Sequence, residues 1–161
     1  LALPTWEVRE RWLAEQLAGR ENAPVLGDLS LCGAPLEVLA QLDSGRPALA
    51  NDLIAALAAG LAGRLGPLEA ARAFADVDVR RLLDTLELCL QAAAQLRAGH
   101  RPRQLRLIDK SVRQLQEIAD KLHFEGLLTF LERVAESRGL VLRSGGIRGT
   151  EVVENLWQAW T

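Results

Sequence analysis

The feature that most constrains the fold of this chain is an uninterrupted apolar stripe at helical spacing within residues 79–98. The stripe consists of Leu82, Leu83, Leu86, Leu90 and Ala93. Residues at this spacing share one face of an α-helix, so the segment predicts a long amphipathic helix. Composition agrees, because Leu and Ala supply 56 of the 161 residues whereas Val, Ile, Phe and Trp supply 21. That bias favours helices over strands, and we expect an all-α protein.

Further helical patterns surround this segment, separated by glycine, proline and capping residues. We expect helices over 49–61, 67–75, 104–122, 124–142 and 150–160. Their packed faces are predicted to carry Leu49, Leu53, Ile54, Leu57, Leu61, Leu105, Ile108, Val112, Leu115, Ala119, Leu122, Leu127, Leu131, Val134, Ala135, Val152, Val153, Leu156, Trp157 and Trp160. Together with 79–98, these segments predict an antiparallel bundle of five or six helices over 46–161.

Local signals predict where several of these helices begin and end. Asp76 or Asp78 is placed to cap the helix over 79–98, and Thr150 to cap the last helix, where Glu151 favours the positively polarised first turn. Glycines at 60, 63 and 66 weaken the end of the helix over 49–61, and Pro67 opens the next. Gly139 is expected to bend or end the helix over 124–142.

The first 44 residues predict a separate small unit of three short helices. The first follows an N-cap at Thr5 and ends at Gly19, the second covers about 24–32, and the third covers 35–43. Gly33 and Pro35 suit the joint between the last two, because glycine closes a helix and proline opens one. The Ser-Gly-Arg-Pro sequence at 44–47 is the expected domain boundary.

Charge and cysteine content exclude several classes of function. The formal net charge is −2, so no global field would drive the domain onto nucleic acid or an anionic membrane. Cys32 and Cys89 lie far apart in apolar helical patterns and are expected to be core residues in a reducing compartment. No targeting signal or membrane-spanning stretch is recognisable, so we expect a cytoplasmic protein without membrane contact. The initial Leu suggests a piece of a longer chain.

Several isolated residues are of types found in catalytic or metal sites, but their sequence contexts indicate structural roles. Asp76 and Asp78 resemble a carboxylate pair for a metal, but caps before a helix explain them more simply. His100 and His123 lack placed catalytic partners and are expected at the surface. Trp157 and Trp160 are expected mainly in the core, with partner anchoring as the alternative. We therefore expect no catalytic residue, no cofactor-binding residue, no metal ligand and no cofactor.

One basic cluster is the candidate contact site for phosphate or for a protein partner. It comprises Arg97, Arg101, Arg103, Arg106, Lys110 and Arg113, opposed only by Asp109. The cluster lacks aromatic residues that would stack on bases, which argues against single-strand or sequence-specific recognition. Three roles for the cluster are left as alternatives: contact with backbone phosphates, a solvated helix end, and a charged patch that faces a protein partner.

Ordered motifs along most of the chain resemble the delta prime subunit family of the bacterial DNA polymerase III clamp loader. They are Trp12-Leu13, the joint Gly33-Ala34-Pro35-Leu36, Leu42-Asp43-Ser44-Gly45, and the terminal segment Phe130–Trp160. The resemblance implies a three-helix lid remnant of an ATPase-like module over 1–44 and a collar-like oligomerisation domain over 46–161. One departure is Gly149-Thr150, where the family often has Asn-Pro.

The same resemblance implies a structural subunit that is not an enzyme. In subunits that hydrolyse ATP, the lid turn carries an arginine that reaches the nucleotide, whereas this chain has Leu36, which cannot stabilise phosphate charge. The implied partners are the delta and gamma or tau subunits, and ATP hydrolysis is expected in these partner subunits. Contact with DNA is expected only through the whole assembly. The alternatives are an unrelated helical protein-interaction module and a weak nucleic-acid-binding helical domain.

Overall fold

The computed structural model describes residues 46–100, 109–143 and 147–160, together with residues 8, 11, 12, 15, 16 and 18. The chain divides into two compact units, Leu1–Gly45 and Arg46–Thr161. The described part of the second unit contains six helices and no strand, which confirms the all-α prediction. In the first unit Val8, Trp12 and Gln16 are helical. The expected helices over 24–32 and 35–43, the joint between them and Leu36 lie outside the described residues.

The helices of the second unit follow the apolar patterns of the sequence. They are α4 (Arg46–Leu61), α5 (Pro67–Ala73), α6 (Val79–Arg97), α7 (Asp109–Lys121), α8 (Phe124–Arg143) and α9 (Gly149–Trp160). All five residues of the predicted α6 stripe are buried, as are all five predicted for α9. The predicted start of α7 at residue 104 lies outside the described residues.

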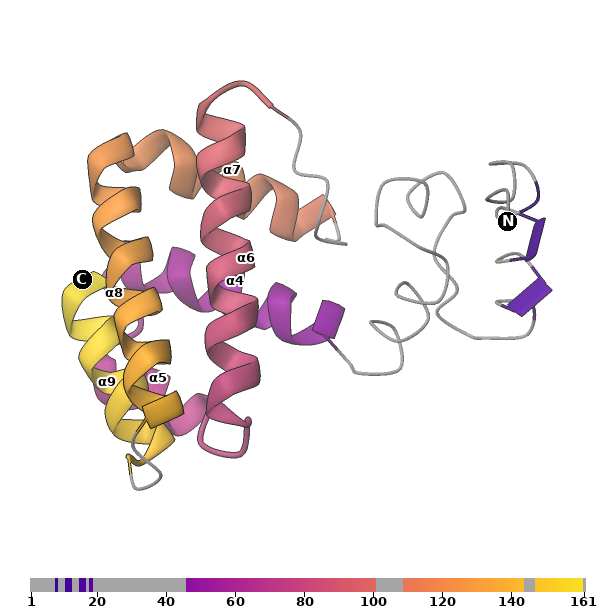
Figure 1. Ribbon diagram of the computed structural model, residues 1–161. Helices are drawn as coiled ribbons and strands as arrows, with labels where there is room; N and C mark the ends of the chain where they lie inside the picture. Colours follow the sequence, from indigo (N-terminus) through magenta and orange to yellow (C-terminus); the bar gives the residue numbers. More distant parts are fainter. Residues whose placement is uncertain are drawn as a thin grey trace. The chain divides into compact units, whose positions relative to one another are not determined.

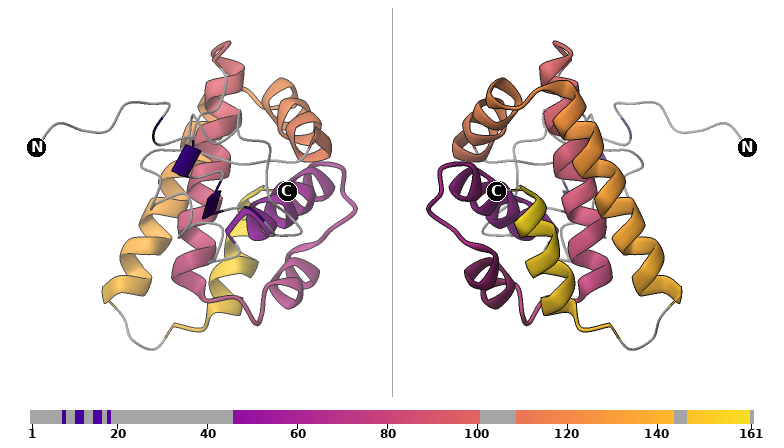
Figure 2. Two further views of the ribbon diagram at one scale, coloured as in Figure 1. Left: turned by 90° about the vertical axis from the view of Figure 1, so that its right-hand side faces the viewer. Right: turned by 90° about the vertical axis from the view of Figure 1, so that its left-hand side faces the viewer.

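Helix α6 lies at the centre of the second unit. Helix α8 packs along it in the opposite chain direction, while α4 and α7 run across it, side by side (Figures 1 and 2). Helices α5 and α9 pack on each other, and α9 also contacts α8 and α4. The unit is therefore a helical bundle in which only some neighbours are antiparallel, because α4 and α7 cross the long pair.

The described core is built mainly from aliphatic side chains of these six helices, together with four aromatic side chains. Among its fully buried members are Leu53, Leu57, Leu83, Leu86, Ile118 and Leu127. Thr85 is buried as well, and its hydroxyl donates to the Arg81 carbonyl oxygen at 2.8 Å within α6, so its polar atom is satisfied. Burial of this much apolar surface is the main stabilising contribution to such a domain.

The ends of α5 and α6 show the start signals that the sequence predicts, since α5 begins at Pro67 and α6 follows a capping aspartate. Of the two predicted candidates, Asp78 is the residue that caps α6, because its carboxylate accepts from the Arg81 N–H at 3.0 Å. The Glu69 carboxylate accepts from the Gly66 N–H at 2.6 Å at the start of α5. Gly63 and Gly99 follow α4 and α6 with φ of 65° and 78°, a conformation that glycine adopts without steric cost.

Two predicted helix starts are wrong. Helix α4 begins at Arg46, inside the expected break, because proline is tolerated in the first turn, where its missing N–H needs no partner. The predicted span of α8 agrees with the structure, and the helix does not end at Gly139 but continues to Arg143. Thr150 does not cap α9, since the first helical hydrogen bonds end on the carbonyl oxygen of Arg148 and the helix already includes Gly149.

Both C-terminal tryptophans lie in the core, which confirms that part of the prediction. Trp157 is fully buried and its ring centroid lies 6.0 Å from that of Phe74. The Trp160 ring lies 4.6 Å from that of Phe130, and its Nε1–H donates to the Leu57 carbonyl oxygen at 2.9 Å. Helix α9 is therefore fastened to the rest of the bundle by aromatic side chains, one of which also supplies a hydrogen bond.

Candidate functional site

The structure distributes the predicted basic cluster over two helices and an undescribed segment. Arg97 is the last residue of α6, and Lys110 and Arg113 lie in the first turns of α7. Arg101, Arg103 and Arg106 lie outside the described residues. The described residues of the cluster are all exposed.

Arg97 holds the end of α7. Its guanidinium Nη1 donates to the Ala119 carbonyl oxygen at 3.2 Å and to the Asp120 carbonyl oxygen at 3.4 Å. These carbonyls belong to the last turn of α7, where unpaired oxygens and the helix dipole concentrate negative potential. Arg97 therefore fastens α7 to α6, a role that the sequence analysis missed because the two partners are more than twenty residues apart.

Lys110 and Arg113 lie near the other end of α7 from this contact. Nine residues separate Lys110 from Ala119, which corresponds to about 13 Å along a helix. The exposed surface of the same helix also carries Asp109, Glu117 and Asp120. The Asp120 carboxylate additionally accepts from the Gln116 amide at 2.9 Å. The described part of the cluster is therefore Arg97 at the end of α6 and, well separated from it, two cations on a helix of mixed charge.

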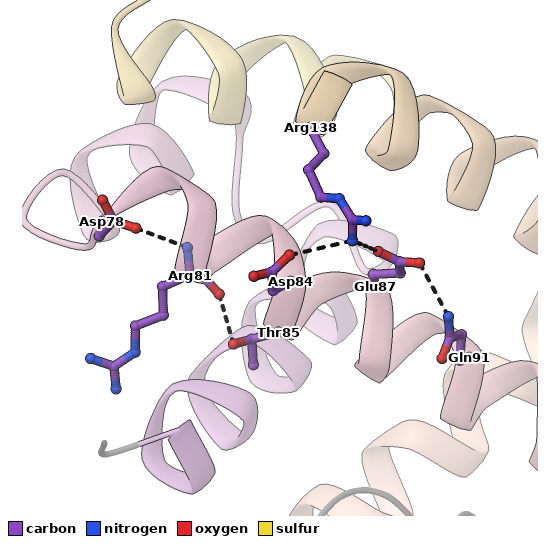
Figure 3. Close-up of polar contacts among 7 residues, drawn as sticks. All are labelled: Asp78, Arg81, Asp84, Thr85, Glu87, Gln91 and Arg138. Carbon is purple, nitrogen blue, oxygen red and sulfur yellow. Dashed lines mark hydrogen bonds and ion pairs between the residues drawn. The ribbon is translucent and has the colours of Figure 1, made fainter. Parts of the chain in front are cut away.

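An ion-pair network joins α6 and α8. Figure 3 shows Arg138 reaching from α8 to two carboxylates of α6, with Nη1 at 3.4 Å from Asp84 and 2.7 Å from Glu87. The second oxygen of Glu87 accepts from the Gln91 amide at 3.2 Å. The Arg138 and Asp84 side chains are nearly half exposed, so each pair contributes no more than about 1 kcal/mol. The network fixes how α8 lies along α6 more than it stabilises the fold.

The histidines and the second aspartate that the sequence analysis considered for catalysis or metal binding lie at the surface. His100 and His123 are exposed, as predicted, and Asp76 is exposed beside the capping Asp78. Within the described residues, no group of three or more His, Cys, Asp or Glu side chains is arranged to hold a metal ion. None of the described helices combines the length and the apolarity required to cross a membrane.

Cys89 is buried in the core, as predicted, and Cys32 lies outside the described residues. The Cys89 thiol lies 3.9 Å from the Ala50 carbonyl oxygen, between α6 and α4. Burial raises the pKa of this thiol from 9.0 to about 12, because the thiolate would lose its hydration. A neutral, enclosed thiol is a poor nucleophile and a poor metal ligand.

We expect Cys89 to resist a thiol reagent as long as the chain is folded. In a Cys32→Ser variant, Ellman's reagent at neutral pH should react only after urea unfolds the protein, because the thiol is both neutral and covered. The reaction is followed by absorbance, with circular dichroism as the check on folding. Rapid modification of the folded protein would show that the α4–α6 contact opens.

Exposed apolar residues gather on α8, away from the packed face of that helix. Phe124, Leu128 and Leu142 are 47%, 42% and 57% exposed, and Leu131 is partly buried against the core. The predicted core assignment is wrong for Ala135 on α8 and for Val112 on α7, since both are exposed. The apolar residues of the exposed face are visible in the sequence of α8. Periodicity alone could not decide which of two adjoining apolar stripes packs inward.

Comparison with protein-family models, with curated proteins and with solved structures found no match to this chain. Its functional assignment therefore depends on the sequence motifs and on the residues described above.

Proposed function

We propose that this chain is the C-terminal part of a clamp-loader delta prime subunit, an assembly component of DNA polymerase III that helps to load the sliding clamp onto primed DNA. The observation that carries the proposal is the order and spacing of the motifs from Trp12-Leu13 through Gly33–Leu36 to the Leu- and Trp-containing last helix. The helical fold of 46–161 is compatible with a collar domain, and residues 1–44 are proposed to be the lid remnant.

The proposed role is association rather than catalysis. A collar domain works by presenting rigid helix surfaces to its neighbours, and the long pair α6 and α8, joined by Arg138, offers such surfaces. Leu36 stands where ATP-hydrolysing relatives are expected to present an arginine to the nucleotide. We therefore assign ATP hydrolysis to the gamma or tau subunits and no cofactor to this chain.

Co-elution of the chain with its proposed partners tests this function. The 161-residue chain is mixed with matching delta and gamma or tau subunits, and we expect it to move into the complex on size exclusion. A duplex-DNA titration of the chain alone, at low and high salt, runs in parallel. Failure to co-elute, together with tight and salt-sensitive DNA binding, would contradict the collar assignment and support a nucleic-acid-binding domain instead.

The nucleic-acid alternative has limited support from the described residues. Arg97 donates to the end of α7, and Lys110 and Arg113 share their helix with three exposed carboxylates. A cationic surface that binds phosphates normally concentrates several unopposed Lys or Arg side chains. The helical protein-interaction module is the stronger alternative, because α8 carries the exposed apolar residues.

A further inference from the structure

Most of the exposed apolar residues of α8 lie on one side of the helix and, with the partly buried Leu131, form a stripe that we call the α8 stripe, whereas the exposed Leu140 lies on the opposite side. The α8 stripe consists of Phe124, Leu128, Leu131, Ala135 and Leu142. The first four are spaced by four, three and four residues, and Leu142 follows seven residues later, which keeps all five on one side of an α-helix. Arg138 occupies the position between Ala135 and Leu142 at this spacing, so the apolar run is continuous from Phe124 to Ala135 and resumes at Leu142. The stripe adjoins the packed face formed by Leu127, Phe130, Val134 and Val141.

The α8 stripe is long enough to accept another helix. Eighteen residues separate its ends, which corresponds to about 27 Å along the helix axis. Three of its large side chains are 42% or more exposed, although their size and apolar character would favour burial. Spacing of this kind is the recognition surface of helix-on-helix association, in which apolar anchors recur every three or four residues.

Carboxylates border the α8 stripe on both sides. On one side Glu125, Glu132 and Glu136 of α8 are exposed and lie along the same edge of the helix. On the other side Asp84 and Glu87 of α6 share the single guanidinium of Arg138 (Figure 3). The edge with the three glutamates also carries the exposed Arg143 at the end of α8, so among the described residues the borders hold five carboxylates against two guanidinium groups and are net negative.

We propose that the α8 stripe is a docking site for a basic amphipathic helix of a partner protein. Apolar side chains of that helix would cover Phe124, Leu128 and Leu131, and its Lys or Arg side chains would lie against the flanking carboxylates. The proposal comes from exposure and charge on α8, and it does not depend on the clamp-loader assignment.

The flanking charge argues against a second copy of this chain as the occupant. Two copies packed antiparallel about a twofold axis would bring like flanks together, because each edge of the stripe meets the same edge of the other copy. Glu132 lies next to the midpoint of the stripe, so this residue of each copy would lie close to the axis. Facing carboxylates of this kind disfavour association, whereas a basic helix meets opposite charge.

A pair of synthetic peptides tests the proposal on the full 161-residue chain. Both have Leu at the two apolar heptad positions of a helix of about 18 residues, the length that spans the stripe. One carries Lys at the flanking positions and the other carries Glu. Fluorescence anisotropy should show saturable binding of the Lys peptide, weakened by salt, and much weaker binding of the Glu peptide.

Variants on and off the stripe separate docking from general charge attraction. Leu128→Ser should weaken binding of the Lys peptide by about tenfold or more, as expected for an apolar anchor. Glu132→Lys with Glu136→Lys should reverse the preference toward the Glu peptide. The controls Val112→Ser and Glu117→Lys change an exposed apolar residue and an exposed carboxylate on α7, and they should leave binding unchanged.

Three results would overturn the proposal. They are absence of saturable binding, equal effects of the α7 and α8 variants, and sedimentation showing that the wild-type chain dimerises and that Leu128→Ser makes it monomeric. Thermal unfolding by circular dichroism confirms that each variant is folded, and Leu128 is exposed enough that its substitution should preserve the fold.

Discussion

Replacing Trp157 by alanine is expected to lower the free energy of unfolding by about 3 to 5 kcal/mol, the cost of emptying a large site in a packed core. Trp157 is fully buried and contacts Phe74 across a centroid distance of 6.0 Å. Urea unfolding followed by circular dichroism measures the change. A loss below about 1 kcal/mol would mean that the core refills the site, contrary to the close packing of protein interiors.

A neighbouring exposed residue provides the matched control for this substitution. Gln158→Ala changes a polar side chain on the outer face of α9 and should alter stability by no more than about 0.5 kcal/mol. The contrast matters for the assembly test, because Trp157→Ala would abolish association by unfolding α9 and not by removing a contact with a partner. Only variants that melt like the wild type identify a binding surface.

The amphipathic pattern was sufficient to predict the helices themselves. For α6 and α9, every residue predicted to pack inward is buried, since a single apolar face leaves one way to orient the helix. Asp78 also caps α6 as one of the two predicted candidates. Where a helix has two adjoining apolar stripes, as α8 does, the prediction failed for Ala135, because only the neighbouring helices decide which stripe is covered.

Contacts between distant segments could not be predicted from the sequence. Arg138 meets Asp84 and Glu87 more than fifty residues away, and Arg97 meets the far end of α7. Both depend on how α6 packs against another helix, which no local spacing encodes. The candidate basic cluster was defined by proximity along the chain. In the structure Arg97, on α6, contacts the C-terminal end of α7, whereas Lys110 lies at the N-terminal end of α7.

The close contact between α4 and α9 depends on the missing side chain of Gly60. A Cβ atom at this position would lie 3.0 Å from Trp160 Cδ1 and 3.5 Å from Trp157 Nε1. The small residue therefore lets both indole rings approach the α4 backbone, where Trp160 Nε1 donates to the Leu57 carbonyl oxygen at 2.9 Å. Even a methyl group at this position requires the Trp160 ring to shift by a few tenths of an ångström, and a branched side chain requires a larger shift.

Gly60→Leu is accordingly expected to destabilise the chain by about 1 to 3 kcal/mol, the usual cost of overpacking a core. The gain in helix propensity over glycine, about 1 kcal/mol in a helix interior, opposes this loss but is smaller near the end of α4. Displacement of Trp160 also breaks its hydrogen bond to Leu57, a further loss of about 1 kcal/mol. Urea unfolding measures the balance, with the exposed substitution Ala62→Leu, next to the end of the same helix, as the control.

A double variant identifies the clash as the cause. Trp160→Ala removes the ring that a leucine side chain at position 60 would strike, so Gly60→Leu should cost less in that background than in the wild type. The two substitutions together should then destabilise by less than the sum of their separate effects, with an interaction energy of about 0.5 kcal/mol or more. Strict additivity would show instead that Gly60 acts through backbone conformation alone, and that the packing of α9 on α4 tolerates a larger residue there.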